Sequence, residues 1–453
     1  MSDAAQAPAT LCDVTVCDVT IIGGGLAGKA AALHLARAGL KVVCIEPRQP
    51  VRPPLGESLD WSAPALLEAL GLSSDHLIAS RIATWKRHVT LKMRDGCDAH
   101  YVPSTWLGGA PFYVNLATLH VERTQLDDEI LKMVLNEGIT FVRDRVVDVE
   151  TEGRKIVTVR TETGARFSSP WFIDASGIGA SVVARKFNLS SLQYGPTKVA
   201  MWTYFKVPLE VEGTTLYMDP KPAEYLEWIW EIPVSPDTVS VGYVAPGAAV
   251  KAMLSQGKSD HGGSVDDLFR RQLEKFSRFE PLLQRGAVGA VNVTSFRCRV
   301  YTESAGPNWL MAGEAASLVD PMTSNGVTAA LRHASEAAAL ILKFRKRGEL
   351  QLRARKAYSN RILQTAKFFN QGIETILYEP LVRTRIGLST AGTVYTSPAW
   401  SMNVVYARLS PSGLFSTFFL AAMLGFFRAS ASILRWYCGL RKLSVEKPQL
   451  GMG

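Results

Sequence analysis

A glycine-rich turn between two apolar runs constrains the fold of this chain more than any other feature. Residues 19–22 form a short apolar run that leads into Gly23-Gly24-Gly25-Leu26-Ala27-Gly28, and an alanine-rich, helix-like stretch follows. A second apolar run at residues 42–45 ends at Glu46. Strand, tight turn, helix, strand and acid is the order of a dinucleotide-binding βαβ unit. The sequence therefore predicts a nucleotide-binding fold near the N-terminus.

The glycines of this turn have separate tasks. Gly23 makes the turn, Gly25 lets the backbone approach a pyrophosphate, and Gly28 lets the helix pack closely on the strand. The helix N-terminus offers free amides and the positive end of its dipole to phosphates. Glu46 is placed to accept hydrogen bonds from an adenosine ribose and would repel a 2′-phosphate, which disfavours NADP.

Two later segments have a similar character. One apolar strand ends in Asp174-Ala175-Ser176-Gly177, a turn of small residues that suits close backbone approach to an adenosine. Another ends at Gly313-Glu314 and leads through Asp320-Pro321 to a helix that begins at Ser324-Asn325-Gly326. Amides at such a helix start hold an anion or the polar edge of a ring. Both segments are predicted to contribute further nucleotide contacts.

Together these segments resemble the FAD-dependent monooxygenase superfamily, and within it the flavin-dependent halogenases that act on pyrroles and phenols. Trp228-Ile229-Trp230-Glu231-Ile232-Pro233 matches the Trp-x-Trp-x-Ile-Pro signature of halogenases. Gly56-Glu57-Ser58, and Arg123 before Leu126-Asp127, fit the same pattern. The resemblance covers about residues 15–345.

The resemblance implies FAD as the cofactor, a separate flavin reductase that supplies it in reduced form, and a halide ion as co-substrate. No second glycine fingerprint follows Asp174, so no NAD(P)H domain is expected in this chain. The halide is expected beside Ser324-Asn325-Gly326, on backbone amides. The residues predicted to contact the cofactor are Gly23, Gly25, Gly28, Glu46, Ser58, Arg123, Asp174, Gly177, Glu314, Asp320, Asn325 and Gly326.

The resemblance also predicts a catalytic lysine that relays hypohalous acid to the substrate. Lys86 lies about where this lysine is expected, although the residues around it match poorly, and Lys92 is the alternative. A solvated strand lysine without a catalytic role would explain either position. Trp228 and Trp230 alternate along a strand, so both indoles face one side and are predicted to separate the flavin from the substrate. Two ordinary core tryptophans fit that spacing equally well.

Departures from the family pattern bear on the reaction. Glu314 stands where an aspartate is usual, and the longer acid is expected still to reach the cofactor. Thr323 stands where tryptophan halogenases carry a glutamate, which argues against free tryptophan as the substrate. The expected function is halogenation of an electron-rich aromatic compound, carrier-bound or lipid-linked. The alternatives are a hydroxylating monooxygenase or polyprenyl-type reductase on the same fold, and a flavin-binding membrane or assembly factor without turnover.

The order of elements predicts an α/β fold class. A Rossmann-like FAD-binding domain is expected over residues 15–345, interrupted by a mostly antiparallel β-sheet substrate domain at about residues 61–119 and 190–290. A strand is expected at residues 110–114 within the first insertion. Residues 346–453 are expected to form a helical C-terminal region.

The net charge of +9 is concentrated near the C-terminal end. Residues 381–453 carry eight basic residues and one acidic residue, a balance of 8 − 1 = +7. Within them residues 414–427 are uncharged, and this stretch is too short to span a bilayer. Basic and aromatic residues flank it. Two interpretations remain open: peripheral attachment to the inner face of the membrane, or a buried helix that covers the site.

Other features of the sequence argue against a metal-binding protein, a nucleic-acid-binding protein and a secreted protein. The six cysteines and seven histidines show no metal-ligand spacing, so no metal site is predicted. The basic residues are not interleaved with stacking aromatic residues, so nucleic acid is not an expected partner. The residues before the glycine turn lack the pattern of a signal peptide, and a cytoplasmic location is expected.

Overall fold

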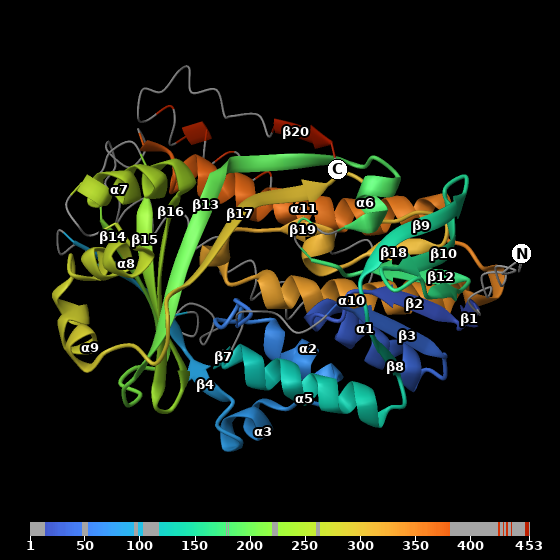
Figure 1. Cartoon of the computed structure of the whole chain (residues 1–453), viewed down its shortest axis with the longest axis horizontal. Helices are drawn as coiled ribbons and strands as arrows, with labels where there is room; N and C mark the ends of the chain where they lie inside the picture. The colour runs from blue at the N-terminus through green and yellow to red at the C-terminus, as the bar shows by residue number, and fades with distance from the viewer. Residues whose placement is uncertain are drawn as a thin grey trace, which may run out of the picture.

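A five-stranded parallel sheet forms the core of one half of the molecule in this computed structural model, on the right in Figure 1. The structure describes residues 14–47, 53–94, 98–102, 117–219 without 178 and 180, 225–259, 263–380, 425, 429, 432, 433, 436 and 449–452. The strands follow the spatial order β18 (Trp309–Met311), β12 (Trp171–Asp174), β2 (Val19–Ile22), β3 (Val42–Glu46) and β8 (Thr140–Arg143). β2 and β12 are buried along their whole length, as continuous apolar runs in a parallel sheet should be.

Helix α1 (Leu26–Arg37) follows β2 directly and packs on this sheet. Its alanines at positions 30–32 are fully buried, and their small side chains let neighbouring elements approach closely. The helices α5 (Arg123–Asn136) and α10 (Gly326–Phe344) both contact α1. These helices bring the residues at their N-terminal ends toward the glycine turn.

Beside the parallel sheet lies a smaller, four-stranded sheet (Figure 1). Its order is β1 (Val14–Val16), β11 (Arg166–Ser168), β10 (Lys155–Thr161) and β9 (Val146–Glu152). Helix α6 (Val182–Lys186) contacts β9.

A large, mainly antiparallel sheet forms the second half of the molecule. Its spatial order is β19 (Ser317–Leu318), β17 (Asn292–Tyr301), β13 (Ser190–Lys206), β16 (Thr238–Pro246), β15 (Glu227–Ser235), β14 (Gly213–Asp219), β5 (His88–Met93) and β6 (Ala99–Tyr101). The short strand β20 (Gln449–Met452) pairs with β13, so the C-terminal end of the chain adds to this sheet.

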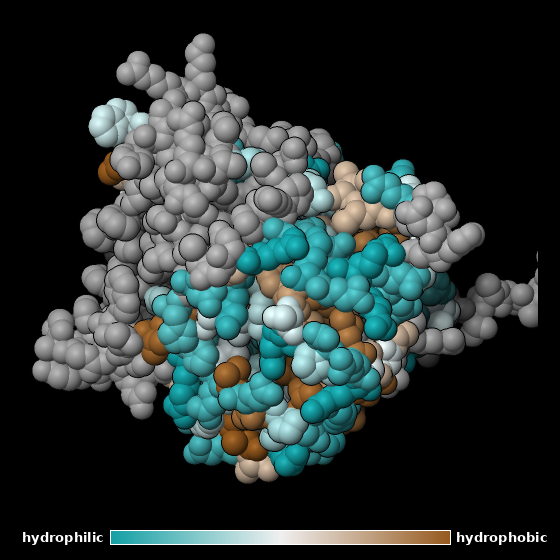
Figure 2. Space-filling view, turned by 90° about the vertical axis from the view of Figure 1, so that its left-hand side faces the viewer, coloured by the Kyte–Doolittle hydropathy of each residue, from teal (hydrophilic) through white to brown (hydrophobic). Residues whose placement is uncertain are grey.

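The two faces of the large sheet support different cores. One face joins the main core, and the other packs against a separate apolar cluster beneath the helices α7 (Gly247–Ser259), α8 (Val265–Leu273) and α9 (Glu280–Arg285). Figure 2 shows the outer side of this part, where hydrophilic residues make up most of the described surface and hydrophobic residues form small, separate patches.

Short elements connect the two halves. β4 (Ala83–Lys86) pairs with β7 (Thr118–Val121) in a two-stranded sheet, and both strands contact β15 of the large sheet. α2 (Ala63–Ala69) contacts α10 and β7, and α3 (Ser74–Ala79) contacts β4. The long helix α11 (Leu352–Ile376) runs beside β13, β17 and β19.

The predicted α/β fold class is confirmed, with a Rossmann-like parallel sheet and a mostly antiparallel sheet inserted into the same chain. The strand expected at residues 110–114 lies outside the described residues, as do residues 414–427 apart from Gly425. None of the helices in the described part of the chain combines the length and apolar character needed to cross a bilayer.

Candidate functional site

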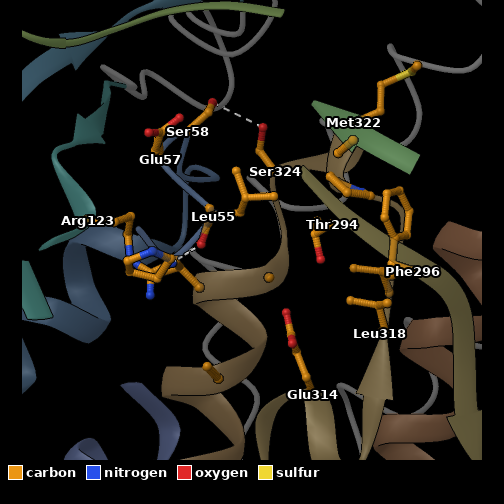
Figure 3. Close-up of a pocket in the computed structure, with 18 of the residues that line it drawn as sticks. Leu55, Glu57, Ser58, Arg123, Thr294, Phe296, Glu314, Leu318, Met322 and Ser324 are labelled. Atoms are coloured by element: carbon orange, nitrogen blue, oxygen red, sulfur yellow. Dashed lines mark hydrogen bonds between the residues drawn. The ribbon is translucent and has the colours of Figure 1, made fainter. Parts of the chain in front are cut away.

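A cavity of ≈ 530 Å³ lies between the parallel sheet and the large sheet. Figure 3 shows Glu57, Ser58 and Arg123 along one side of it, and Phe296 and Leu318 on the opposite side. Eight of the fifteen residues predicted for the site line this cavity: Gly25, Ser58, Arg123, Gly177, Trp228, Trp230, Glu314 and Gly326. The fold therefore brings most of the motifs found in the sequence to one place.

The glycine turn opens one end of the cavity. A Cβ atom added at Gly25 would meet no protein atom within 4 Å, so a side chain there would project into the space beside the helix start. Gly23 has φ +99°, and a Cβ on Gly28 would lie 1.9 Å from the Gly23 carbonyl oxygen. Gly23 and Gly28 thus shape the turn, while Gly25 leaves room for a ligand.

Arg123 begins helix α5 and is held by half-buried partners. Its guanidinium donates to Asp127 Oδ2 at 2.9 and 3.2 Å and to the Leu55 carbonyl, while Lys29 binds Asp127 Oδ1 at 3.1 Å. Lys29 and Arg123 lower the pKa of the Asp127 carboxyl, which opposes the effect of its burial. The net result is a positively charged patch at the cavity wall, suited to a phosphate or another anionic group.

Glu314 faces Arg123 from the other side of the cavity, and its side chain is exposed to that space. Desolvation inside the molecule raises the pKa of its carboxyl, and Arg123 and Arg299 oppose this. An acid at this point can accept hydrogen bonds from a polar ligand, as predicted from its position after β18.

Lys86 lies directly behind the cavity wall and is fully buried. Its ammonium donates to Ser58 Oγ and to the Leu59 carbonyl, both at 2.8 Å, and to Ser324 Oγ at 3.3 Å. It also lies 4.9 Å from the centre of the Trp61 ring. Burial lowers the pKa of Lys86 to about 7, an effect that nearby Asp60 opposes.

Lys92, the alternative relay residue, is in a different environment. It lies on β5 with 48% of its side chain exposed, and its ammonium is 3.9 Å from Asp98. The two lysines are therefore clearly distinguished by burial.

The two tryptophans of the signature lie on one face of β15. Trp228 and Trp230 line the cavity with their ring centres 5.9 Å apart, whereas Ile229 packs into the cluster on the opposite face. The Trp228 indole donates to the Tyr378 hydroxyl at 2.9 Å, and the Trp230 indole donates to Ser240 Oγ at 3.1 Å. Both rings are thus fixed as part of the wall.

Four residues predicted to touch the cofactor have side chains bonded elsewhere in the structure. Glu46 accepts a hydrogen bond from the Gly24 amide. Asp174 accepts four hydrogen bonds, from the amides and hydroxyls of residues 176, 181 and 183. Asp320 binds Lys198 at 2.9 Å, and Asn325 donates to Asp60 at 2.7 Å. Asp174 thus satisfies donors of its own turn, whereas Glu46, Asp320 and Asn325 connect segments that are distant in the chain. In both ways these side chains shape the loops around the cavity.

Sequence reasoning missed other polar residues of the site. Glu57 lines the cavity, accepts a hydrogen bond from the Tyr204 hydroxyl at 2.7 Å, and burial raises its pKa to about 7. Thr214 lines the cavity too, and buried His120 lies against it. Glu57 could have been found from its place in the Gly-Glu-Ser segment, but no spacing in the sequence indicates that Thr214 and His120 meet.

Known proteins resemble this chain in sequence. Residues 18–254, more than half of the chain, match the family model described as lycopene cyclase protein. A tryptophan 2-halogenase of Chondromyces crocatus is 26% identical over 333 residues, which cover 71% of this chain and 60% of the relative. A 1H-pyrrole-2-carbonyl-[peptidyl-carrier protein] brominase of Pseudoalteromonas luteoviolacea is 26% identical over 70% of this chain and 75% of the relative. The chain thus spans less than two thirds of the first of these relatives.

Solved structures show the same fold. The halogenase PltM, in complex with phloroglucinol and FAD, has a TM-score of 0.71 at 16% identity, with 95% of this chain and 94% of that chain covered. The flavin-dependent brominase Bmp2 has a TM-score of 0.66 at 20% identity, covering 92% and 98%.

The residues around the cavity fit FAD. The open space at Gly25, the helix start beside it and the Arg123 guanidinium suit a pyrophosphate, and Glu314 suits a polar chain. The fold, the family model and the relatives agree with this arrangement. The chain therefore belongs to the FAD-dependent monooxygenase superfamily, in the family that the lycopene cyclase model describes and with flavin-dependent halogenases among its relatives.

Proposed function

We propose that this protein is a flavin-dependent halogenase, which uses reduced FAD, O2 and a halide ion to halogenate an electron-rich aromatic compound. The observation that carries the proposal is the environment of Lys86. Its ammonium is buried between the Gly-Glu-Ser segment and the turn at Ser324, directly behind the cavity. The two hydroxyls that accept from this ammonium belong to Ser58 and Ser324, which both line the cavity, so Lys86 is held directly beside the ligand space.

In this proposal, each group of residues in the site has a separate role. Bound in reduced form with O2 and halide, FAD supplies an electrophilic halogen as hypohalous acid. The Lys86 ammonium, with a pKa near 7, would exchange its longest hydrogen bond, to Ser324 Oγ at 3.3 Å, for one to that acid and so orient it toward the substrate. Trp228 and Trp230 make the wall of the chamber apolar and limit the access of water. Glu57, whose pKa is also near 7, is placed to accept a proton from the substrate.

The same proposal implies a partner enzyme and a class of substrate. A separate flavin reductase supplies the reduced flavin, because no second dinucleotide fingerprint is found in the sequence. The preferred substrate is a phenol or a pyrrole rather than free tryptophan, since Thr323 stands where a glutamate would be expected. The pyrrole brominase among the relatives supports a carrier-bound substrate as one form to test.

A reconstitution experiment tests the proposal. The full-length protein is supplied with FAD, NADH, a flavin reductase, air and either bromide or chloride, together with phenols, pyrroles and free tryptophan. Mass spectrometry should detect a halogenated phenol or pyrrole whose formation requires the halide. A hydroxylated product that forms equally well without halide would contradict the proposal and favour a monooxygenase.

The family match favours a second candidate. A model described as lycopene cyclase protein fits residues 18–254, so an FAD-dependent reaction on a polyprenyl-type chain, such as its reduction, is the alternative. Incubation with a polyprenyl compound and reduced FAD, without halide, separates the two candidates. Binding of FAD without turnover in either assay would favour a non-catalytic role.

A further inference from the structure

A buried series of hydrogen bonds begins at Lys86 and runs away from the cavity. The Lys86 ammonium donates to Ser58 Oγ at 2.8 Å, and Ser58 Oγ lies 2.9 Å from Thr214 Oγ1. Thr214 Oγ1 in turn lies 2.9 Å from His120 Nε2. All four side chains are buried, so water competes little for these bonds.

The series ends at the strand that carries the two tryptophans of the cavity wall. His120 Nδ1 lies 3.4 Å from Thr84 Oγ1, and the Thr84 hydroxyl donates to the carbonyl of Pro233 on β15. Thr84 and His120 are direct partners in the pairing of β4 with β7. The halogenase signature of β15 is therefore connected to Lys86 through His120.

Both ends fix the direction of the hydrogen bonds. A carbonyl can only accept, so the Thr84 hydroxyl is used as a donor to Pro233, and its oxygen accepts from His120 Nδ1–H. His120 is then a neutral imidazole whose Nε2 accepts from the Thr214 hydroxyl. This tautomer agrees with the burial of His120, which lowers its pKa well below the ordinary value.

The other end gives the same direction. An ammonium group can only donate, so Ser58 Oγ accepts from Lys86, and Ser324 Oγ also donates to it at 3.1 Å (Figure 3). The Ser58 hydroxyl is left to donate to Thr214. Each group from Lys86 to Pro233 therefore donates to the next, and the lone pairs of Ser58 are directed at Lys86 and Ser324.

We propose that His120 is a positioning residue for Lys86: through Thr214 it holds the Ser58 hydroxyl as an acceptor, and so keeps the Lys86 ammonium charged and fixed beside the Ser324 turn. The inference deepens the proposed function, because the relay role of Lys86 rests on that proposal.

Other charged and titratable residues near Lys86 do not take over the role of the Ser58 hydroxyl as its acceptor. Asp60 lies close enough to favour the ammonium, but its oxygens accept from Ser62 and Asn325. His88 on β5 lies near enough to His120 to lower its pKa, as burial and Lys86 also do. In the described part of the chain, Lys86 has two hydroxyls and one carbonyl as acceptors. The orientation of each hydroxyl therefore affects the charge of Lys86.

The test measures the protonation of Lys86 directly. Full-length protein carrying oxidised FAD is labelled with 13C at lysine Cε, and the Lys86 resonance is assigned by its loss in Lys86→Met. The resonance is titrated in the wild type, in Thr214→Val, in His120→Leu and in Thr214→Ser. Valine has nearly the shape of threonine but no hydroxyl, whereas serine keeps the hydroxyl and is the matched control.

Loss of an oriented acceptor removes stabilisation from the ammonium, so its titration midpoint should fall. We expect a decrease of about one pH unit in Thr214→Val and in His120→Leu, the size that corresponds to one charged hydrogen bond. Thr214→Ser should stay within a few tenths of a unit of the wild type. The pH profile of product formation should move in the same order.

Unchanged midpoints in both Thr214→Val and His120→Leu would overturn the inference and leave His120 with a packing role. The resonance is read without turnover, so its result does not depend on the reaction. Shifted midpoints in a protein that forms no halogenated product would leave the support of Lys86 standing and contradict the proposed function instead.

Discussion

Burial lowers the pKa of Lys86, the residue on which the proposed function depends. Its pKa of about 7 in the folded chain lies below its value of 10.5 in the unfolded chain, so the unfolded chain binds more protons between these pH values. Stability should therefore rise as the pH increases from about 7 to about 10, as the buried ammonium is neutralised. Each unit of pKa difference corresponds to about 1.4 kcal/mol.

Urea unfolding of wild type, Lys86→Met and Lys92→Met across this pH range checks the prediction. The difference in unfolding free energy between wild type and Lys86→Met should grow in favour of the wild type by about 2 kcal/mol or more as the pH rises. Lys92→Met should follow the wild type, because Lys92 is exposed. Parallel pH dependences in wild type and Lys86→Met would show that Lys86 has an ordinary pKa.

For single residues, the sequence indicated which side chains belong to the site better than it indicated which other side chains they contact. Lys86 could be chosen because its distance from the Gly-Glu-Ser segment follows the family pattern. Its contact with Ser58 and Ser324 depends on three segments that are far apart in the chain. Asp174 was predicted near the cofactor because its turn of small residues suits backbone approach, and Asp320 because of the family resemblance. The sequence did not indicate that both carboxylates are also bonded within the protein.

At the scale of the element, the turn between β2 and α1 offers a matched pair of variants. Gly25→Val should abolish FAD binding and leave the fold intact, because the added Cβ meets no protein atom within 4 Å and the side chain enters the cavity. Gly28→Val should disrupt the fold itself, since its Cβ would lie 1.9 Å from the Gly23 oxygen. Flavin absorbance of the purified proteins and circular dichroism separate the two effects. Full FAD occupancy in Gly25→Val would refute the assignment of the turn.

The contact between β13 and α11 depends on a buried ion cluster. Lys198 binds Asp320 at 2.9 Å and Glu374 at 2.7 Å, and lies 3.7 Å from the centre of the Tyr378 ring. Burial alone would lower the pKa of Lys198, but Asp320 and the neighbouring groups raise it well above its usual range. The cluster connects the loop at Asp320 and strand β13 to helix α11.

Lys198→Met should destabilise the protein by about 3–5 kcal/mol, because the buried carboxylate of Asp320 and the partly buried carboxylate of Glu374 lose their cation. Lys206→Met on the same strand is the control, since Lys206 is 61% exposed and its removal should cost about 0.5 kcal/mol or less. Urea unfolding at neutral pH provides both values. Equal stability of the two variants would mean that the cluster contributes nothing to the fold.

For the whole molecule, the α/β fold could be predicted because the apolar runs of the sequence follow the periods of strands and helices. The parallel sheet was predicted from the βαβ order, and the large sheet from the insertions expected at about residues 61–119 and 190–290. The pairing of β20 with β13, and the position of α11 beside that strand, depend on contacts between distant segments, so the local pattern did not reveal them.

The charge distribution gives a prediction for the whole molecule as well. Residues 381–453 carry a net charge of +7, and residues 414–427 are uncharged, so reversible binding to anionic liposomes is expected. Each base near the surface contributes about 1 kcal/mol, so raised salt should release much of the protein. Flotation with liposomes at low and high salt, with and without residues 410–453, measures this. A full-length chain that stays unbound at low salt would contradict it.

In the proposed function, Lys86 enables halogenation at the FAD site. The most direct measurement compares halogenated product formed by wild type, Lys86→Met and Lys92→Met in the reconstituted assay, with FAD content determined for each. We expect Lys86→Met to bind FAD as the wild type does but to lose product by about 100-fold or more, the size typical of losing a group that transfers or orients a reactive species. Lys92→Met should remain active. Unchanged halogenation by Lys86→Met would contradict the proposed role of Lys86.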